Sequence, residues 1–361
     1  MPLPPGGSPC ILLVTPEIAY LPEGIAANAH QVNIGTGPLA ERAAALVQAL
    51  FQNGVDVHVA LPDFRRLFRA PCRCALAGES RQRLSVCEER VHLAQDRHIF
   101  YWKPQLSRHM KDAITIALAF QREVINHIVP IVQPDLIHCM GWMTGLVPAM
   151  ARQRDISCLF SIQNFDTGKA CLDTIEDRGI DAAGFWNHLY YEQYPSDYET
   201  TRESIPVDFM ASGILASDCV SVDSPVSLRD IVAGRSAFLD DGLRRVLIQK
   251  WEAGNAIDMG CPPASLLQAA HSGDGFLFDD AHPAEVNRVM HRARAFYPLL
   301  VKENHRQMHR IMTESTLAAT QHAAPDRYMK RYGKMLRQPE WAADAVHQTF
   351  MGKFQDSEAA R

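Results

Sequence analysis

The feature of this sequence that most constrains its fold is a regular alternation of predicted strands and helices up to about residue 235. The apolar run CILLVTPE (10–17) predicts a buried strand. PLAERAAALVQALFQNG (38–54) has apolar residues at helical spacing, begins with a proline and ends with a glycine. VDVHVALP (55–62) predicts a second strand. A strand, a helix and a strand in this order form a βαβ unit, which implies a parallel sheet.

The alternation then continues. We expect two short strands within 84–102, further strands at 134–142, 157–165 and 219–225, and helices at 112–132, 143–153, 208–218 and 226–234. This order predicts an α/β fold, a Rossmann-like doubly wound parallel sheet with both faces covered by helices. Ligands of such sheets bind at the carboxyl ends of the strands. After residue 250 strand-like runs become scarce, apart from GFLFDD (275–280), and 282–352 has a helical pattern.

Composition excludes some classes of partner. The net charge of -5 and the isoelectric point near 6.3 give no reason to expect binding to nucleic acid or to an anionic membrane. The sequence has no apolar run long enough to span a membrane, and MPLPPGGSP at its start lacks the basic region of a signal peptide. Nine cysteines without a CxxC pair fit reduced thiols. Together these features predict a cytoplasmic protein.

The stretch GTGPLAERA (35–43) lies where an open α/β fold often binds an anion, between the first strand and the first helix. Gly37 and the helix N-terminus can offer amide hydrogens to an anion. However, Pro38 has no N–H, and no lysine or arginine precedes Arg42 in this stretch. The loop is therefore either a weak anion site or only a structural turn into the helix.

Several segments together carry a resemblance to a known family. They are ILLVTPEIAYL, GTGPLAERAAALVQALFQNGVDVHVALP, PDLIHCMGWMTGLVPA, FSIQNF, FMASGILASDCVSVDSPVSLRDI and, further along, GLRRVL, GNAID and GDGFLFDDAHPAEVNRVMHRARAFY. In this order and spacing, the chain resembles the bacterial glycogen synthases and plant starch synthases over most of residues 10–335.

The resemblance implies the GT-B architecture, in which two Rossmann-like domains flank a cleft. Members of the family transfer glucose from ADP-glucose or UDP-glucose to an α-1,4-glucan. The chain then divides into an N-terminal catalytic-domain homologue (1–250), a shortened remnant of the donor domain (251–281) and a C-terminal helical segment (282–361). In GT-B enzymes the last helices cross back onto the N-terminal domain, so we expect the terminal helices to pack on the sheet here.

The departures from the family lie at its chemical positions. The family's first loop, Lys-x-Gly-Gly-Leu, is Gly35-Thr36-Gly37-Pro38-Leu39 here, without the cation that would meet the donor phosphates. Its His-Asp-Trp-His stretch is Met140-Gly141-Trp142-Met143, in which Trp142 either packs or serves as a platform for a sugar. Its Val-His-Asn is Ile162-Gln163-Asn164, and Gln163 can bond a sugar hydroxyl but cannot carry a proton at neutral pH.

The donor domain shows a further departure. Only residues 259–272 separate GNAID from GDGFLF, and they contain no counterpart of the arginine, lysine and glutamate that hold the donor in the family. We therefore expect the second Rossmann domain to be mostly absent.

Two other groups of residues have side chains that can bind a ligand. His305 and His309 stand one helical turn apart near Glu303, without a clear third ligand, so we predict no metal site. The tyrosine-rich, acidic stretch 190–199 either stacks on a sugar or caps the core.

Three hypotheses of function follow. The first is a degenerate homologue without glucosyl transfer and without a cofactor, which binds an α-glucan such as glycogen or a partner enzyme of glycogen metabolism. Its residual sugar or anion site comprises Gly35, Thr36, Gly37, Trp142, Gln163 and Asn164, and no residue is assigned as catalytic. The second is an active glycosyltransferase that moves glucose from ADP-glucose or UDP-glucose to an α-1,4-glucan. A nucleotide sugar is expected as a ligand only under this hypothesis. The third is an interaction scaffold without sugar binding.

Overall fold

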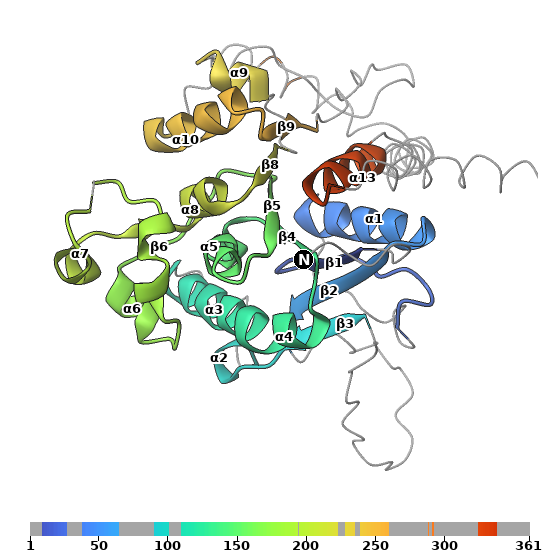
Figure 1. The fold of residues 1–361 in the computed structure, drawn as a ribbon, viewed down its shortest axis with the longest axis horizontal. Coiled ribbons are helices and arrows are strands. Elements are labelled where there is room, and N and C mark those ends of the chain that lie inside the picture. The colour runs from blue at the N-terminus through green and yellow to red at the C-terminus, as the bar shows by residue number, and fades with distance from the viewer. Residues whose placement is uncertain are drawn as a thin grey trace, which may run out of the picture. The chain divides into compact units, whose positions relative to one another are not determined.

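A seven-stranded sheet forms the centre of the fold, in a computed structural model of the chain (Figure 1). The strands stand in the order β3-β2-β1-β4-β5-β8-β9, and all neighbours are parallel. They are β1 (Cys10–Val14), β2 (Asp56–Pro62), β3 (Val91–Ala94), β4 (Leu136–Met140), β5 (Ser157–Ile162), β8 (Cys219–Val222) and β9 (Ala256–Asp258). The predicted doubly wound α/β fold is confirmed, and β9 is a strand that the sequence did not indicate.

The structure describes residues 9–26, 38–64, 90–100, 110–193, 195–222, 228–234, 239–259, 288, 291 and 324–337. Residues 1–260 and 324–361 form one compact unit, and residues 261–323 form another, of which only Arg288 and His291 are described. None of the described helices has the length and apolar character needed to cross a membrane. The division of the chain into three segments stays a prediction.

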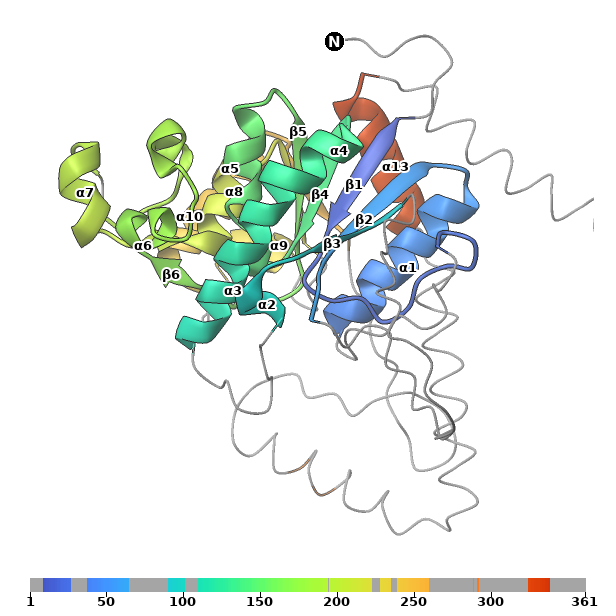
Figure 2. The same ribbon diagram turned by 90° about the horizontal axis from the view of Figure 1, so that it is seen from below.

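Helices cover both faces of the sheet (Figures 1 and 2). One face packs against α1 (Pro38–Gln52) and α13 (Ala324–Met335), and the other against α3 (Met110–Glu123), α5 (Val147–Arg152) and α8 (Phe209–Ala216). Further described elements are α2 (Arg97–Phe100), α4 (Val129–Val132), α6 (Leu172–Glu176), α7 (Tyr198–Ser204), α9 (Leu228–Val232), α10 (Asp241–Glu252), the hairpin strands β6 (Lys169–Ala170) and β7 (Val207–Asp208), and short 3-10 turns at Trp142–Thr144, Ala182–Gly184 and Trp186–His188.

Two hydrophobic cores follow from the alternation of side chains along each strand. Ile11 and Leu13 of β1 face the core beneath α1 and α13, whereas Leu12 and Val14 face the core beneath α3 and α5. Because both faces are buried, the strands are apolar throughout, as the uninterrupted run after residue 10 indicated.

The helix predicted over 112–132 is continuous but changes its winding. Residues Val124–Ile128 form a π turn between α3 and α4, and the Val129 amide donates to the Val124 carbonyl. Pro130 follows at once and has no N–H to donate, so the local break in the α-helical ladder is accommodated at this point.

The strand predicted for RHIFYW (97–102) is wrong where the structure describes it, because residues Arg97–Phe100 form helix α2. Asp96 decides this. Its side chain accepts the amide of His98 at 2.7 Å, and its carbonyl accepts the amides of Ile99 at 3.1 Å and Phe100 at 2.9 Å. An aspartate at a helix start thus outweighs the strand preference of the isoleucine and phenylalanine.

The prediction that the C-terminal part packs back on the sheet is confirmed for α13. Tyr328, Met329 and Tyr332 of this helix are buried in the same core as α1 and the strands. In both views α13 lies beside α1 (Figures 1 and 2). The helix therefore closes a face of the sheet that would otherwise expose apolar side chains.

Candidate functional site

The carboxyl ends of the strands define the candidate site. Since the strands are all parallel, these ends lie along one edge of the sheet, and the strand order reverses between β1 and β4. Ligands of doubly wound folds bind beside such a reversal. Trp142 follows β4 directly, and Gln163 and Asn164 follow β5. The structure therefore places these three predicted site residues at the edge that the fold favours for ligands.

Gln163 is the most unusual side chain at this edge. It is 8% exposed, yet in the described part of the chain neither its Nε2 nor its Oε1 has a hydrogen-bond partner. A buried amide without partners costs about 1–3 kcal/mol. Its amide can donate and accept at once, as the hydroxyl group of a ligand would require.

Trp142 has the contacts of a packed residue. It is half-buried, and its ring centroid lies 6.3 Å from that of Phe209. A Cβ on Gly168 would come within 2.5 Å of the Trp142 ring, so only a glycine fits against it. These contacts support the packing alternative. Asn164, by contrast, is exposed.

The turn that carries Trp142 depends on Gly141. This glycine has φ +75°, a conformation that side chains disfavour, and its carbonyl accepts the hydroxyl of Thr144 at 2.8 Å. Leu39, in the first turn of α1, lies 3.1 Å from the position of a Cβ on Gly141. The end of β4 and the start of α1 are thus in contact.

The remaining predicted site residues, Gly35, Thr36 and Gly37, lie outside the described residues, as do His305 and His309. The anion-binding role of the loop stays a prediction. In the stretch 190–199, Tyr191 is 8% exposed and donates to the Trp186 carbonyl at 2.9 Å, while the Tyr198 hydroxyl donates to Glu176. These two tyrosines are held within the protein, in line with the capping alternative.

Sequence reasoning missed a buried polar network beside the site. His138 of β4 is hydrogen-bonded through Nδ1 to the Tyr332 hydroxyl and through Nε2 to Ser161 Oγ, each at 2.6 Å. Ser161, Ser221 and Tyr328 bond one another at 2.5 to 3.0 Å. Burial lowers the pKa of His138 to about 3, so the ring is neutral and accepts one of its bonds.

The network joins strands β4, β5 and β8 to α13. Tyr328 and Tyr332 are four residues apart and therefore lie on one side of the helix. This spacing in RYMKRY was the available signal, but the strand partners lie more than 100 residues earlier in the chain. The network orients the C-terminal helix against the sheet.

One group of metal-binding side chains lies elsewhere in the described part of the chain. Cys10, Asp56 and His58 offer a sulfur, a carboxylate oxygen and a ring nitrogen that all lie within 4.8 Å of one another. They come from the amino-terminal halves of β1 and β2, so they lie away from the edge that carries Gln163. The described cysteines Cys10, Cys139, Cys158, Cys171 and Cys219 are free.

Comparison with known proteins identifies the family. The profile described as starch synthase catalytic domain matches residues 11–248. The chain belongs to this family. It is 27% identical over 233 residues to the glycogen synthase of Geobacillus thermodenitrificans, and this match covers 58% of the chain and 46% of the relative. It is 26% identical over 249 residues to the glycogen synthase of Cellvibrio japonicus, with 59% and 47% covered.

The chain spans about half the length of these curated relatives. Among solved structures, the catalytic domain of starch synthase IV from Arabidopsis thaliana, bound to ADP and acarbose, is 20% identical. Its TM-score is 0.49, and the match covers 70% of this chain and 51% of that chain. The match of the family profile to residues 11–248 confirms, at the level of the family, the resemblance found in the sequence.

Proposed function

We propose that this member of the starch synthase catalytic domain family binds an α-glucan without transferring glucose. The single observation that carries the proposal is the buried amide of Gln163 at the carboxyl end of β5, which has no hydrogen-bond partner among the described residues. Such a group is costly unless a ligand pairs with it, and a sugar hydroxyl supplies the donor and acceptor that the amide lacks.

The absence of transfer is proposed from the substituted positions. A diphosphate leaving group requires positive charge, or amide hydrogens directed at it, for stabilisation. The first loop has Gly35 where the family has lysine, and it has Pro38, which lacks an N–H, where the family has glycine. Gln163 itself replaces a histidine, and an amide cannot act as a general acid or base at neutral pH. The short segment 259–272 leaves little room for the groups that hold a nucleotide sugar.

The packing of the site supports binding rather than chemistry. In place of the family's charged and titratable residues, Met140 and Met143 flank the turn after β4, and Trp142 between them packs on Phe209. None of these side chains can act as a general acid or base.

Glycogen co-sedimentation tests the proposal. We expect the wild-type protein to pellet with glycogen and the Gln163→Ala variant to remain mostly in the supernatant. The matched control is Gln153→Ala, an exposed glutamine at the end of α5, which should pellet as the wild type does. Equal pelleting of all three proteins would contradict the role of Gln163.

Two alternatives are separated by further measurements. Incorporation of labelled glucose into glycogen from ADP-glucose or UDP-glucose, lost in Gln163→Ala, would establish an active transferase and overturn the proposal. No pelleting of the wild type would favour an interaction scaffold, or a protein that binds a partner enzyme of glycogen metabolism in place of the glucan.

A further inference from the structure

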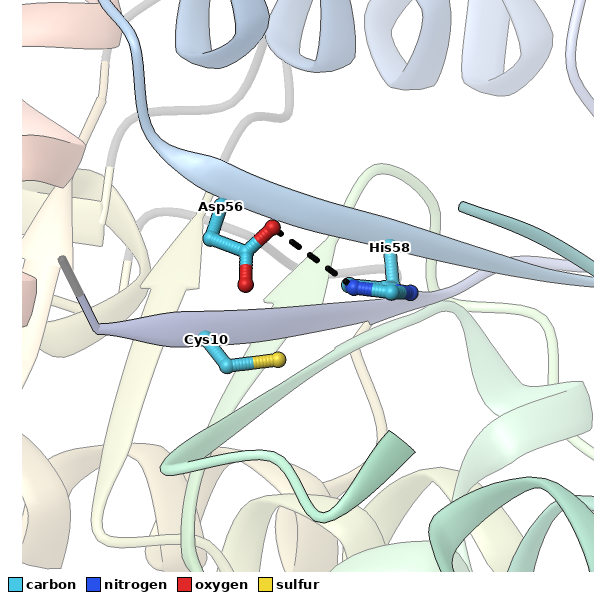
Figure 3. A group of neighbouring side chains, drawn as sticks. All are labelled: Cys10, Asp56 and His58. Atoms are coloured by element: carbon cyan, nitrogen blue, oxygen red, sulfur yellow. Dashed lines mark ion pairs between the residues drawn. The ribbon is translucent and has the colours of Figure 1, made fainter. Parts of the chain in front are cut away.

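Three side chains with different metal-binding atoms share one face of the sheet, far from the candidate sugar site. Cys10 opens β1 and pairs in register with Asp56, which opens β2. His58 stands two residues after Asp56 and so points to the same face. Figure 3 shows the thiol of Cys10 and the carboxylate of Asp56 on neighbouring strands, with the ring of His58 close to both. The register of two strands, not a sequence motif, brings them together.

The distances between the three ligand atoms suit an ion with tetrahedral coordination. Ligand atoms around zinc stand about 3.4–3.6 Å apart, given the usual bond lengths. Oδ1 of Asp56 and Nε2 of His58 are already 3.6 Å apart, and one ligand atom from each of the three residues lies within 4.8 Å of the other two. All three residues are half-buried, which leaves room for a water molecule as the fourth ligand.

The orientation of His58 leaves its Nε2 available to bind a metal ion. Its Nδ1 is hydrogen-bonded to Nε2 of His92 at 2.9 Å, and the two rings stack with centroids 5.2 Å apart. If His58 donates this bond, its Nε2 carries a lone pair and faces Asp56. Metal-binding histidines typically hold their second nitrogen in such a bond. His92 thus acts as a positioning residue for a ligand.

The charges around the cluster favour a cation. Asp135 adds a second carboxylate, whose Oδ2 accepts the amide of Cys10 at 2.8 Å. Arg90 opposes it, because this guanidinium lies 3.2 Å from Oδ1 of Asp56. The same Oδ1 lies 3.6 Å from Nε2 of His58, and a carboxylate oxygen has two lone pairs, so Arg90 and an ion can share it. The two carboxylates outweigh the one arginine.

We propose that Cys10, Asp56 and His58 bind one divalent transition-metal ion, best matched by zinc. Sulfur, nitrogen and oxygen donors together suit this ion better than magnesium or calcium, which take oxygen ligands alone. The thiol of Cys10 releases its proton to solvent when the sulfur binds the ion. The site does not involve the sugar-binding residues, so it stands apart from the proposed function.

Titration with zinc and with cobalt(II) tests the site in the full-length protein. We expect the wild type to bind zinc, and Cys10→Ser and His58→Gln to weaken binding by more than about 10-fold, since loss of even a supporting residue commonly costs 10- to 100-fold. His92→Gln should weaken it less. The cobalt complex should show a thiolate-to-cobalt absorption band that Cys10→Ser abolishes.

The matched control is Cys171→Ser. Cys171 is also a free, half-buried thiol close to a carboxylate, that of Asp173. This variant should keep both the affinity and the cobalt band. Zinc should also protect Cys10, but not Cys171, from alkylation, as peptide mass spectrometry would show.

Three outcomes would overturn the proposal. One is zinc binding by the wild type that is no tighter than by Cys10→Ser. Another is a cobalt band that survives Cys10→Ser. A third is binding that disappears in a His305→Gln, His309→Gln double variant but persists in His58→Gln, which would place the metal on the C-terminal segment. Circular dichroism of each variant excludes loss through unfolding.

Discussion

Two buried polar side chains, one on β4 and one just after the neighbouring strand β5, have opposite surroundings. His138 of β4 is fully buried, and both of its ring nitrogens are hydrogen-bonded, to Tyr332 and Ser161. Gln163, just after β5, is also buried, but in the described part of the chain neither of its polar atoms is paired. Because an unpaired buried group is costly, the comparison separates a polar group that holds the fold from one that is available to a ligand.

The largest expected effect is the loss of stability when Tyr332, the partner of His138, is replaced. Replacing Tyr332 by alanine removes a fully buried ring and the hydrogen-bond partner of His138, so the free energy of unfolding should fall by about 3–5 kcal/mol. Tyr332→Phe keeps the ring and should cost about 1–3 kcal/mol, through the unpaired histidine. Urea denaturation followed by circular dichroism measures both. A loss below about 1 kcal/mol for Tyr332→Ala would mean that α13 is not docked on the sheet.

Acid should weaken the same network. The pKa of His138 is lowered to about 3 in the folded protein, whereas an unfolded histidine titrates near 6.5. Between these values the unfolded chain binds a proton that the folded chain does not, so stability falls as pH decreases, by up to about 1.4 kcal/mol per pH unit. His138→Gln cannot titrate and should show a smaller slope. Denaturation curves from pH 7 to pH 5 compare them, and equal slopes would contradict the assignment.

A pair of buried glutamines, Gln163 and Gln121, sharpens the comparison. Gln163→Leu removes an amide that has no partner in the part of the chain that the structure describes, so stability should stay the same or rise by about 1 kcal/mol. Gln121→Leu removes an acceptor that binds the amide of Leu146 at 2.6 Å, and should cost about 1–3 kcal/mol. Thermal unfolding of both variants gives the contrast. A clear destabilisation by Gln163→Leu would reveal an internal partner and weaken the case for a ligand.

The smallest effect is expected where the network has spare bonds. Ser221→Ala removes one hydroxyl, but Ser161 and Tyr328 remain bonded to each other at 3.0 Å. The cost should be about 0.5–1.5 kcal/mol, which is the usual worth of one hydrogen bond. Urea denaturation checks this value. A loss as large as that of Tyr332→Ala would show that Ser221 organises the whole cluster.

Much of the fold could be predicted from the sequence because its signals are local. The apolar spacing after Pro38 and the stop at Gly54 correspond to α1, which spans Pro38–Gln52. The apolar runs correspond to the central strands. The prediction failed at residues 97–100, where the hydrogen bonds from Asp96 favour a helix over the strand preference of the side chains.

The candidate site could be predicted only in part. Its place at the strand ends and the identity of Gln163 and Trp142 follow from the order of strands and from the family resemblance. The lack of a partner for Gln163 among the described residues depends on which groups surround it. The packing of Trp142 on Phe209 depends on a helix 67 residues further along the chain. No local pattern carries this information.

The sequence by itself therefore determined the parallel α/β sheet and the family, and it placed Gln163 and Trp142 after strands, because periodicity and residue identity are properties of the chain. Only the tertiary structure decided that Tyr328 and Tyr332 bind the strands, that Gln163 is buried without a partner among the described residues, and that Cys10 lies beside Asp56 and His58. The physical reason is that hydrogen bonding and metal binding depend on atoms a few ångströms apart, and strand register and helix docking bring together residues that are far apart in the chain.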